Sequence, residues 1–402
     1  MSLNRLSSKL LQFPQVLVLM VLFSFLSLAA VVFTPAFPEL VKEFRLSNPE
    51  AQWMMTIFLL GTAIGRLPYG PLANRIGRKN TLFVGLIVSF IGTLLIIFAD
   101  TYLIVCVGRF VQAFGCAVTL KIGYTMVGDL HAGSSATKVL SYGMLVYAIL
   151  PGIGAAIAGF LTPYFGWQGG FWFLLIFTIA LILSCFSLPE TSSERDLNAL
   201  QIKKIALGYA AQFKDTHLVL WGCLMGLSTA ILFVFSQEAP FVAIDLMGIS
   251  PQEYGVFYLV PAFGIAAGSL LTVWLADRLS ALMGMLVGIL GILIGTIAML
   301  VFFLSGWASG WSLFLPQVIV QLGDALLYTN ASSEGLSEAS DKSNASAVML
   351  FINSLVAVLG TFLVGYFAPR SLMTMPIAFL VMTAILLVIW WRLRLFEELL
   401  RK

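Results

Sequence analysis

The chain has 402 residues, of which 60% are apolar and only 10% are charged. A soluble domain carries about 25% charged residues, so a composition this poor in charge excludes a water-soluble globular protein of this size. The formal net charge of +3 is too small to indicate a class of partner. We expect no nucleic-acid partner.

Long apolar stretches follow one another along the whole chain. A helix needs about 20 apolar residues to cross the hydrocarbon layer of a membrane, and runs this long and continuous are helices, not the alternating strands of a barrel. The sequence therefore predicts an all-α membrane protein with twelve transmembrane helices. They are expected at about 14–39, 52–72, 81–99, 102–127, 138–162, 168–188, 218–243, 254–276, 282–304, 311–331, 345–367 and 372–392.

The first stretch follows Arg5 and Lys9, as the apolar region of a secretory signal peptide does. It is too long for such a region, however, and eleven more predicted spans come after it. We interpret it as the first transmembrane helix and not as a leader.

Basic residues set the expected orientation in the membrane. Of the 22 Lys and Arg residues, three lie inside predicted helices. On one side of the expected membrane the loops contain only Lys42, Arg45 and Arg370. All the others lie on the opposite side. Because short cytoplasmic loops carry the excess of Lys and Arg, we expect both termini in the cytoplasm and the chain in a bacterial inner membrane.

A polar segment at 189–217 divides the chain into predicted bundles of six helices, 1–188 and 218–402. Its part at about 198–213 is predicted to form an amphipathic helix on the membrane surface. A weak repeat supports this division, because Asn74-Arg75 and Asp277-Arg278 occupy equivalent loops of the two halves. Two parallel six-helix repeats are a known plan of transporters, with the substrate site near mid-membrane between them.

The loop after the second predicted helix has a tight pattern of glycine and basic residues. From Gly70 to Lys79 it reads Gly-Pro-Leu-Ala-Asn-Arg-Ile-Gly-Arg-Lys, which resembles the loop 2–3 signature of the major facilitator superfamily. The resemblance implies gating roles for residues in this loop and in related motifs. These residues are Gly70, Asn74, Arg75, Gly77, Arg78, Asp129, Pro151, Gly154, Asp277 and Arg278.

Further motifs resemble one branch of that superfamily, the twelve-helix drug:proton antiporters. The fourth predicted helix has an R-x-x-Q-x-x-G pattern, the fifth has Pro-Gly-Ile-Gly, and Leu-Pro-Glu-Thr follows the sixth, as in Bcr/CflA-like transporters. The resemblance spans the chain and implies the major facilitator fold, with two pseudo-symmetric bundles around a central cavity. The motifs begin at Arg109, Pro151 and Leu188, and Gly166-Trp167 adds to them.

Three departures from the family pattern bear on mechanism. Asn74 stands where the family has the aspartate that latches the two halves on the cytoplasmic side. The part of the first predicted helix where many relatives carry an acid, from Ser24 to Val31, has no carboxylate, so any proton-coupling acid must lie elsewhere. Arg66 and Asp324 occupy positions at which relatives usually have glutamine and an apolar residue.

Five charged residues fall inside predicted helices. Each costs at least about 2.5–3.5 kcal/mol in hydrocarbon, so such residues are paired or face water. All five are on helices that line or flank the cavity in the family fold, which favours a functional role. They are Arg66, Arg109, Lys121, Glu238 and Asp324.

The tenth predicted helix has one polar stripe among Val, Ile, Leu and Ala. Gln317, Gln321, Asp324 and Tyr328 are spaced four, three and four apart, so they lie within about 60° on one face. The stripe predicts a cavity wall with Asp324 as proton-coupling acid. The alternative is a seam of hydrogen bonds between helices.

The cations have two interpretations each. Arg109, with Gln112 on the same face, predicts either a substrate contact or a structural tie to neighbouring helices. Lys121 either faces the cavity or extends to cytoplasmic water. Arg66 is interpreted either as an anion clamp or as a gate contact. The first interpretation rests on the ability of a guanidinium to bind a carboxylate with two parallel hydrogen bonds.

Two further residues complete the predicted site. Glu238, next to Pro240 near the periplasmic mouth, is either a second proton-coupling acid or a rim residue. Tyr147 lies on a helix beside the cavity and is expected to contact substrate.

No nucleotide-binding motif, catalytic dyad or metal-ligand spacing occurs, so we expect no cofactor, no enzyme activity and gradient-driven transport by a monomer. The leading hypothesis is proton-coupled export of a small organic anion, such as a carboxylate-bearing drug, metabolite or siderophore. The second is proton-coupled import of an organic anion or ferric siderophore. A non-transporting receptor or intramembrane enzyme is a third, and the chain lacks the soluble domain or dyad that it would need.

Overall fold

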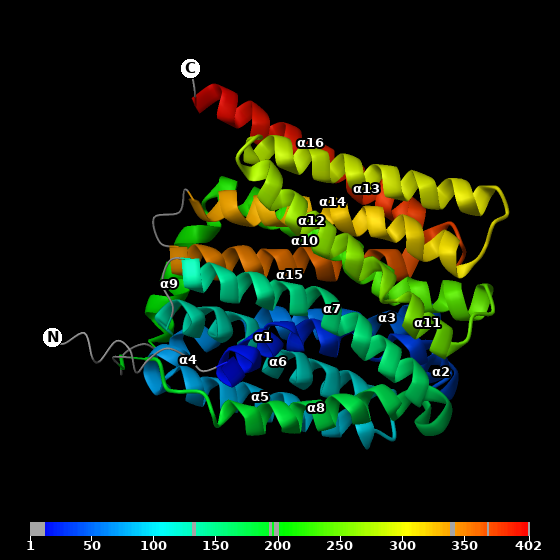
Figure 1. Ribbon diagram of the computed structural model, residues 1–402, viewed down its shortest axis with the longest axis horizontal. Coiled ribbons are helices and arrows are strands. Elements are labelled where there is room, and N and C mark those ends of the chain that lie inside the picture. Colours follow the sequence, from blue (N-terminus) through cyan, green and yellow to red (C-terminus); the bar gives the residue numbers. More distant parts are fainter. Residues whose placement is uncertain are drawn as a thin grey trace.

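The computed structural model describes residues 13–130, 134–192, 195–196, 201–337, 342–367 and 370–400. All regular secondary structure in these residues is helical, as predicted (Figure 1). Before the linker lie α1 (Phe13–Val31), η3 (Thr34–Ala36), α2 (Phe37–Glu43), α3 (Asn48–Gly65), α4 (Tyr69–Ile76), α5 (Arg78–Ile97), α6 (Tyr102–Leu130), α7 (Ser134–Phe165), η4 (Gly166–Gln168) and α8 (Gly169–Cys185).

The predicted surface helix in the linker is present as α9 (Ile202–Phe213). After it lie α10 (Thr216–Pro240), the π-helical η5 (Phe241–Leu246), α11 (Pro251–Phe257), α12 (Val260–Ala276), α13 (Ala281–Leu304), α14 (Gly310–Ser337), α15 (Lys342–Phe367) and α16 (Thr374–Leu400).

Ten stretches of the described residues are long and apolar enough to cross a membrane. One of them, Tyr142–Cys185, holds most of α7 and all of α8. Helix α3, with its polar first turn, is not among the ten. The helices are therefore consistent with the twelve predicted spans.

Three predicted helices are interrupted where the sequence pattern suggested continuous ones. The first breaks before Pro35, the second between α3 and α4 at Pro68, and the eighth between α11 and α12 next to Pro261. Proline lacks the backbone N–H and clashes with the preceding turn, so it bends or ends a helix.

The packing of helices repeats between the two halves. Helix α6 packs against α3 and α5, and α14 packs in the same way against α12 and α13. The pairing of α1 with α7 is repeated by α10 with α15. Glycines allow the closest of these contacts, since a Cβ at Gly115 would overlap the backbone of Ser89. The boundaries 1–188, 189–217 and 218–402 stay a prediction.

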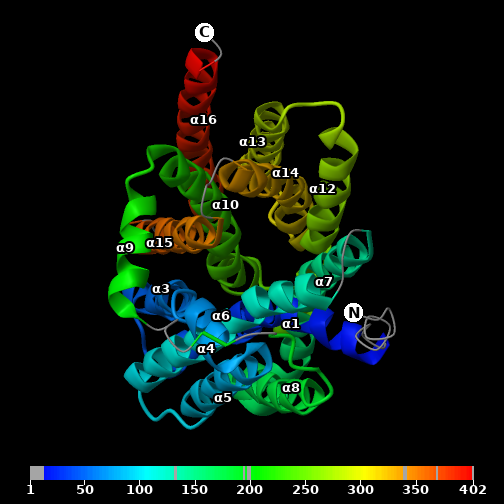
Figure 2. The same cartoon turned by 90° about the vertical axis from the view of Figure 1, so that its left-hand side faces the viewer.

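The most extensive contacts between the halves are those of α3 with α15 and of α7 with α11. Figure 2 shows α3 beside α15 from the side on which α9 lies. We call that side, where α1 begins and α16 ends, the linker end. The opposite side, with α2 and α11, is the far end (Figure 1).

Candidate functional site

A pocket lies between the two halves near the middle of the molecule. Residues of α1 and α7 line it from one half, and residues of α10, α12, α14 and the α11–α12 junction line it from the other. Three of the predicted site residues, Tyr147, Pro151 and Gln321, are among them. The lining comprises Ser27, Val31, Tyr147, Ala148, Pro151, Gly152, Leu232, Phe233, Phe235, Tyr258, Pro261, Ala262, Ile265 and Gln321.

The wall of this pocket is mainly apolar and aromatic. Hydroxyl groups of Ser27, Tyr147 and Tyr258 and the amide of Gln321 are its polar members, and none of its lining residues is charged. The pocket is small in this structure, about 60 Å³, and its apolar wall with a few hydrogen-bonding groups has the chemistry of a site for small organic compounds.

Asp324 lies one helical turn from Gln321, toward the linker end of α14. Its side chain is buried, with 8% exposed, and Ser228 Oγ of α10 donates a hydrogen bond of 2.5 Å to its Oδ1. Gln317, one turn on the other side, is fully buried, and neither polar atom of its amide has a partner among the described residues. The predicted stripe thus runs from the pocket wall into the contact between α10 and α14.

Arg66 crosses the boundary between the halves on the linker side of the pocket. It caps α3, and its Nη1 donates to Ser354 Oγ (2.7 Å) and to the carbonyl of Leu350 (3.1 Å), both on α15. Arg66 therefore joins the two halves through its hydrogen bonds to α15.

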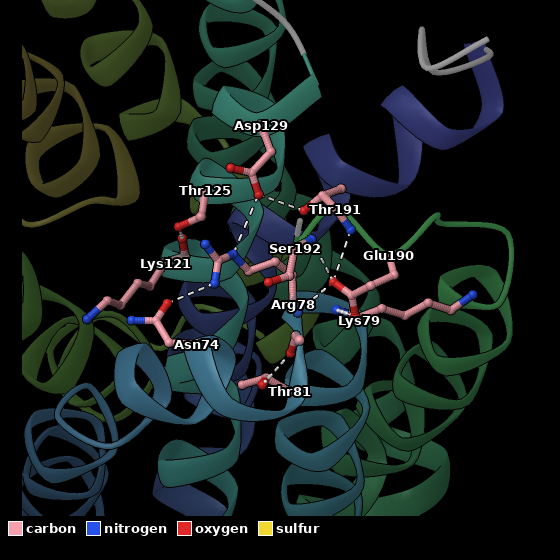
Figure 3. A network of polar contacts seen from close by, with 11 residues as sticks. Asn74, Arg78, Lys79, Thr81, Lys121, Thr125, Asp129, Glu190, Thr191 and Ser192 are labelled. Carbon is pink, nitrogen blue, oxygen red and sulfur yellow. Dashed lines mark hydrogen bonds and ion pairs between the residues drawn. The ribbon is translucent and has the colours of Figure 1, made fainter. Parts of the chain in front are cut away.

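Lys121 projects from the middle of α6 toward the start of α4. Its Nζ is next to Gly70, where a Cβ would come within 2.7 Å of it. Figure 3 shows the ammonium group pointing away from the polar network around Arg78 and Asp129. Among the described residues, neither Lys121 nor Arg66 has a carboxylate within 4.0 Å.

Arg109 and Gln112 lie elsewhere, inside the first bundle, and both are fully buried. The Nη1 of Arg109 donates to the carbonyl of Ala29 and to Gln112 Oε1, each at 2.8 Å, and Gln112 donates to Thr93 Oγ1 at 2.9 Å. The guanidinium also lies 4.1 Å from the ring centre of Phe58. These contacts tie α6 to α1, α3 and α5, and they do not reach the pocket lining.

Glu238 lies at the far end of the boundary, not at the pocket. Only 4% of it is exposed, and it accepts a 2.9 Å hydrogen bond from Gln52 Nε2 of the other half. Lys42 and Asp245 form a second contact between the halves, an ion pair of 3.0 Å. The guanidinium of Arg370 lies 3.6 Å from the ring centre of Phe241.

Aromatic and glycine contacts complete this closure. Phe37 packs on Phe241 with ring centres 4.9 Å apart, and a Cβ at Gly255 would lie 2.7 Å from the carbonyl of Ala155. The far end is therefore closed by contacts between the halves. The sequence did not point to Gln52, Lys42 or Asp245 as site residues. The two members of each contact, Gln52 with Glu238 and Lys42 with Asp245, lie about half a chain apart in the sequence.

The loop 2–3 motif forms a polar network at the linker end (Figure 3). Arg78 Nε lies 3.5 Å from Asp129 Oδ2, and Arg78 Nη1 donates to Asn74 Oδ1 at 2.9 Å. Thr191 Oγ1 donates to the same Asp129 oxygen at 2.7 Å. All these partners belong to the first half or to the start of the linker. The side chain of Asn74 therefore contacts Arg78 of its own half, whereas the family's aspartate at this position latches the two halves.

Glu190 holds the start of the linker against this network. Its carboxylate accepts from the backbone N–H groups of Arg78 (2.8 Å) and Lys79 (3.2 Å), which begin α5. Gly77 precedes them with φ of +97°, a conformation that favours glycine. The Pro-Glu-Thr motif was the signal for this residue, but only a structure shows what it caps.

The remaining predicted gating residues are dispersed. Arg75 is exposed on α4, and Gly154 of α7 faces Leu28 of α1. In the second half, Asp277 caps α12, and Arg278 lies over the ring of Trp274 at 3.6 Å. The equivalent positions Arg75 and Arg278 therefore differ, since Arg278 contacts an aromatic ring just beyond the end of α12.

The sequence and the fold were compared with known proteins. A sequence model described as Major Facilitator Superfamily matches residues 17–361. An uncharacterized transporter of Rickettsia bellii is 31% identical over 254 residues, which are 63% of this chain and 62% of the relative. The bicyclomycin resistance protein homolog of Haemophilus influenzae is 26% identical, over 62% of this chain and 63% of that protein. The chain thus spans less than two thirds of the length of these relatives.

The fold is similar to that of solved transporters. The xylose transporter XylE of E. coli, in a partially occluded inward-open conformation, superimposes with a TM-score of 0.74, covering 94% of this chain and 97% of XylE. The sequences are 15% identical, so this similarity concerns the fold alone.

Proposed function

Because the chain belongs to the major facilitator superfamily, a family of membrane transporters and not of enzymes, we propose that it exports a small organic compound across a bacterial inner membrane, driven by protons. The observation that carries this proposal is the pocket lined by both halves. A rocking motion of one bundle against the other exposes such a pocket first to one side of the membrane and then to the other.

The orientation follows from the distribution of charge. Apart from the cations buried in the bundles, most described Lys and Arg residues lie at the linker end, among them Arg75, Arg78, Lys79, Lys214 and Arg278. We therefore place this end, with both termini, in the cytoplasm. The far-end contacts, Gln52 with Glu238 and Lys42 with Asp245, then form the periplasmic gate. In this arrangement the monomer holds its pocket closed toward the periplasm.

Asp324 is our candidate for the proton-coupling acid. It is buried next to the pocket, on the same helix face as Gln321, and its hydrogen-bond partner among the described residues is the neutral hydroxyl of Ser228. A carboxyl group in such a place can gain and lose a proton as the halves move and change its exposure to water. Glu238, which was the other candidate, contributes to the gate instead.

Export is supported by the resistance named in the relative from Haemophilus influenzae and by the apolar wall of the pocket. The test is transport in membrane vesicles, after a screen of drugs, organic acids and siderophores for compounds that raise the melting temperature of the purified protein. Everted vesicles should accumulate the identified compound when energised with a proton gradient. Accumulation in intact cells, and none in everted vesicles, would contradict export.

A second candidate function is import of an organic anion together with protons. The observation that favours it is the pair of cations, Arg66 and Lys121, on the cytoplasmic side of the pocket without a carboxylate partner among the described residues. The same comparison of intact cells with everted vesicles separates import from export.

A further inference from the structure

Two of the four polar groups in the pocket wall are already engaged by the protein itself. Ser27 Oγ donates to the carbonyl of Ser24 at 2.9 Å, and the hydroxyls of Tyr258 and Ser236 share a hydrogen bond of 2.7 Å. Each bond joins residues of the same half. These contacts use the donor of Ser27 and hold the hydroxyl of Tyr258 in place.

The other two polar groups, the amide of Gln321 and the hydroxyl of Tyr147, have no hydrogen-bond partner among the described residues. Only 2% of Gln321 is exposed. A buried polar group without a partner is unfavourable, and native proteins contain few of them. An unpartnered amide in the wall of a pocket is therefore placed to bond with a compound that enters the pocket.

Packing against α12 holds the base of Gln321 in position. A Cβ at Gly264 of α12 would overlap the carbonyl of Val318 and lie 3.1 Å from the Cβ of Gln321. The glycine thus lets the two helices approach closely. Tyr147 lines the same pocket from α7, so the two unpartnered groups come from different halves.

The rest of the pocket wall is aromatic or aliphatic. The ring of Phe235 packs against those of Tyr258 and Phe314, with ring centres 6.0 and 5.7 Å away, and Phe233 adds a further ring to the wall. No lining residue is charged. A charged group that left water for this wall would lose its hydration and gain no counter-charge. The wall therefore favours an uncharged compound with a flat apolar body.

The polar stripe of α14 has a different function at each turn. Asp324 accepts a hydrogen bond of 2.5 Å from Ser228 and so contributes to the contact between α14 and α10. Gln317 is fully buried and lies outside the pocket lining. Gln321 lines the pocket and makes no hydrogen bond to a neighbouring helix in the described part of the chain.

We propose that Gln321 and Tyr147 together recognise an uncharged group of the transported compound that offers a hydrogen-bond acceptor beside a donor, such as a carboxamide or a lactam. A glutamine amide presents an N–H donor and a carbonyl acceptor side by side, and a tyrosine hydroxyl can donate to the carbonyl of the same ligand group. The inference rests on the proposed transport function, since it takes the pocket as the binding site of that compound. Through these two residues the compound bonds to both halves at once.

The test is titration calorimetry at pH 7 on the full chain purified in detergent. The probes are compact, because the pocket holds about 60 Å³ in this structure, and form two series: benzamide, acetophenone and benzoate, and the corresponding 2-naphthyl compounds. The ketone keeps the acceptor but lacks the donor, and the carboxylate is ionised at this pH. In at least one series we expect the amide to bind about fivefold more tightly than the ketone, and the carboxylate to bind most weakly.

Two variants separate the contributions of the recognising residues. Gln321→Leu removes a donor and an acceptor at nearly constant volume, so it should weaken the amide more than the ketone and abolish the preference between them. Tyr147→Phe removes only a donor to the carbonyl that both probes carry. It should weaken amide and ketone alike, by a few-fold, and keep the preference.

Gln317→Leu is the matched control. It makes the same change one helical turn away, outside the pocket lining, and should alter neither the affinities nor the preference. A preference that survives in Gln321→Leu, or that Gln317→Leu abolishes as well, would overturn the assignment of Gln321.

The order of the three probes in the unaltered protein decides the proposal even if a variant does not fold. An amide that binds no better than the ketone would contradict recognition of a donor, and a carboxylate that binds as tightly as the amide would contradict selection for uncharged compounds. If no probe of either series binds, the inference fails. The vesicle experiment, which starts from any compound that stabilises the protein, then still decides the proposed function.

Discussion

Arg109 illustrates what a single residue contributes inside the membrane. It is fully buried, it donates to backbone carbonyls of α1, and its guanidinium lies against the rings of Phe58 and Phe33. The sequence predicted that this cation is either a substrate contact or a tie between helices. Spacing along one helix could not decide between them, because it shows which residues share a face but not what that face meets.

Replacing Arg109 by glutamine should therefore reduce stability more than it changes specificity. The variant loses charge-assisted hydrogen bonds to α1 and leaves a buried carbonyl without a donor, which costs about 2–3 kcal/mol. We expect a lower melting temperature of the purified protein. Arg75→Gln, which changes an exposed cation on α4, should leave the melting temperature unchanged. Equal melting temperatures for both variants would show that the contacts to α1 are not stabilising.

The role of Glu190, like that of Arg109, depends on the groups that its side chain contacts. Its carboxylate accepts from the first two N–H groups of α5 and from the N–H groups of Thr191 and Ser192. A carboxylate at this place is favoured both by hydrogen bonds and by the helix dipole.

Glu190→Ala should lower the free energy of unfolding by about 1 kcal/mol, since it removes a capping group. The loss should be accompanied by faster proteolysis of the linker, because its first residues are held to α5 through this carboxylate. Asp100→Asn, a change in an exposed loop, serves as control. A linker that resists protease equally in both variants would contradict the capping role.

At the scale of elements, hydropathy predicted the helices well because lipid leaves the backbone no other partner than itself. The predicted stretches agree with the observed helices within a few residues at most ends. The breaks at Pro35 and Pro68 were missed because a proline in an apolar run does not show whether the helix bends or ends.

The contact of α7 with α11 gives a prediction about gating. A Cβ at Gly159 would overlap the backbone at Pro251, so Gly159→Leu should prevent the far end from closing. We expect a cysteine introduced in place of Ala155 to react faster with a membrane-impermeant maleimide in the Gly159→Leu background.

Gly128→Ala is the matched control, because nothing lies within 4 Å of the Cβ that it adds. The reactivity of the introduced cysteine should not change in that background. An unchanged rate in the Gly159→Leu background as well would mean that α7 and α11 can separate and close without this contact.

At the scale of the whole molecule, the sequence predicted the family, the two-fold repeat of helices and the charged residues within them. It could not predict which charges meet across the boundary, since partners such as Lys42 and Asp245 are separated by 203 residues. The closure of the far end therefore became apparent only from the structure.

The ion pair of Lys42 with Asp245 should bias the balance between closed and open states. Lys42 is 72% exposed, and exposed pairs contribute about 0.2–1 kcal/mol. Lys42→Glu replaces attraction by repulsion and should increase labelling of a far-end cysteine by a few-fold. The second change Asp245→Lys restores an ion pair and should restore the original labelling. A double variant that labels like the single one would exclude the pair from the gate.

The central claim is that a compound bound between the halves moves together with, or against, a proton carried by Asp324. The most direct measurement is proton flux in proteoliposomes that contain a pH-sensitive dye, started by a gradient of a compound that stabilises the purified protein. We predict a flux for the unaltered protein, and no flux for Asp324→Asn although that variant still binds the compound. An undiminished proton flux through Asp324→Asn would contradict this account.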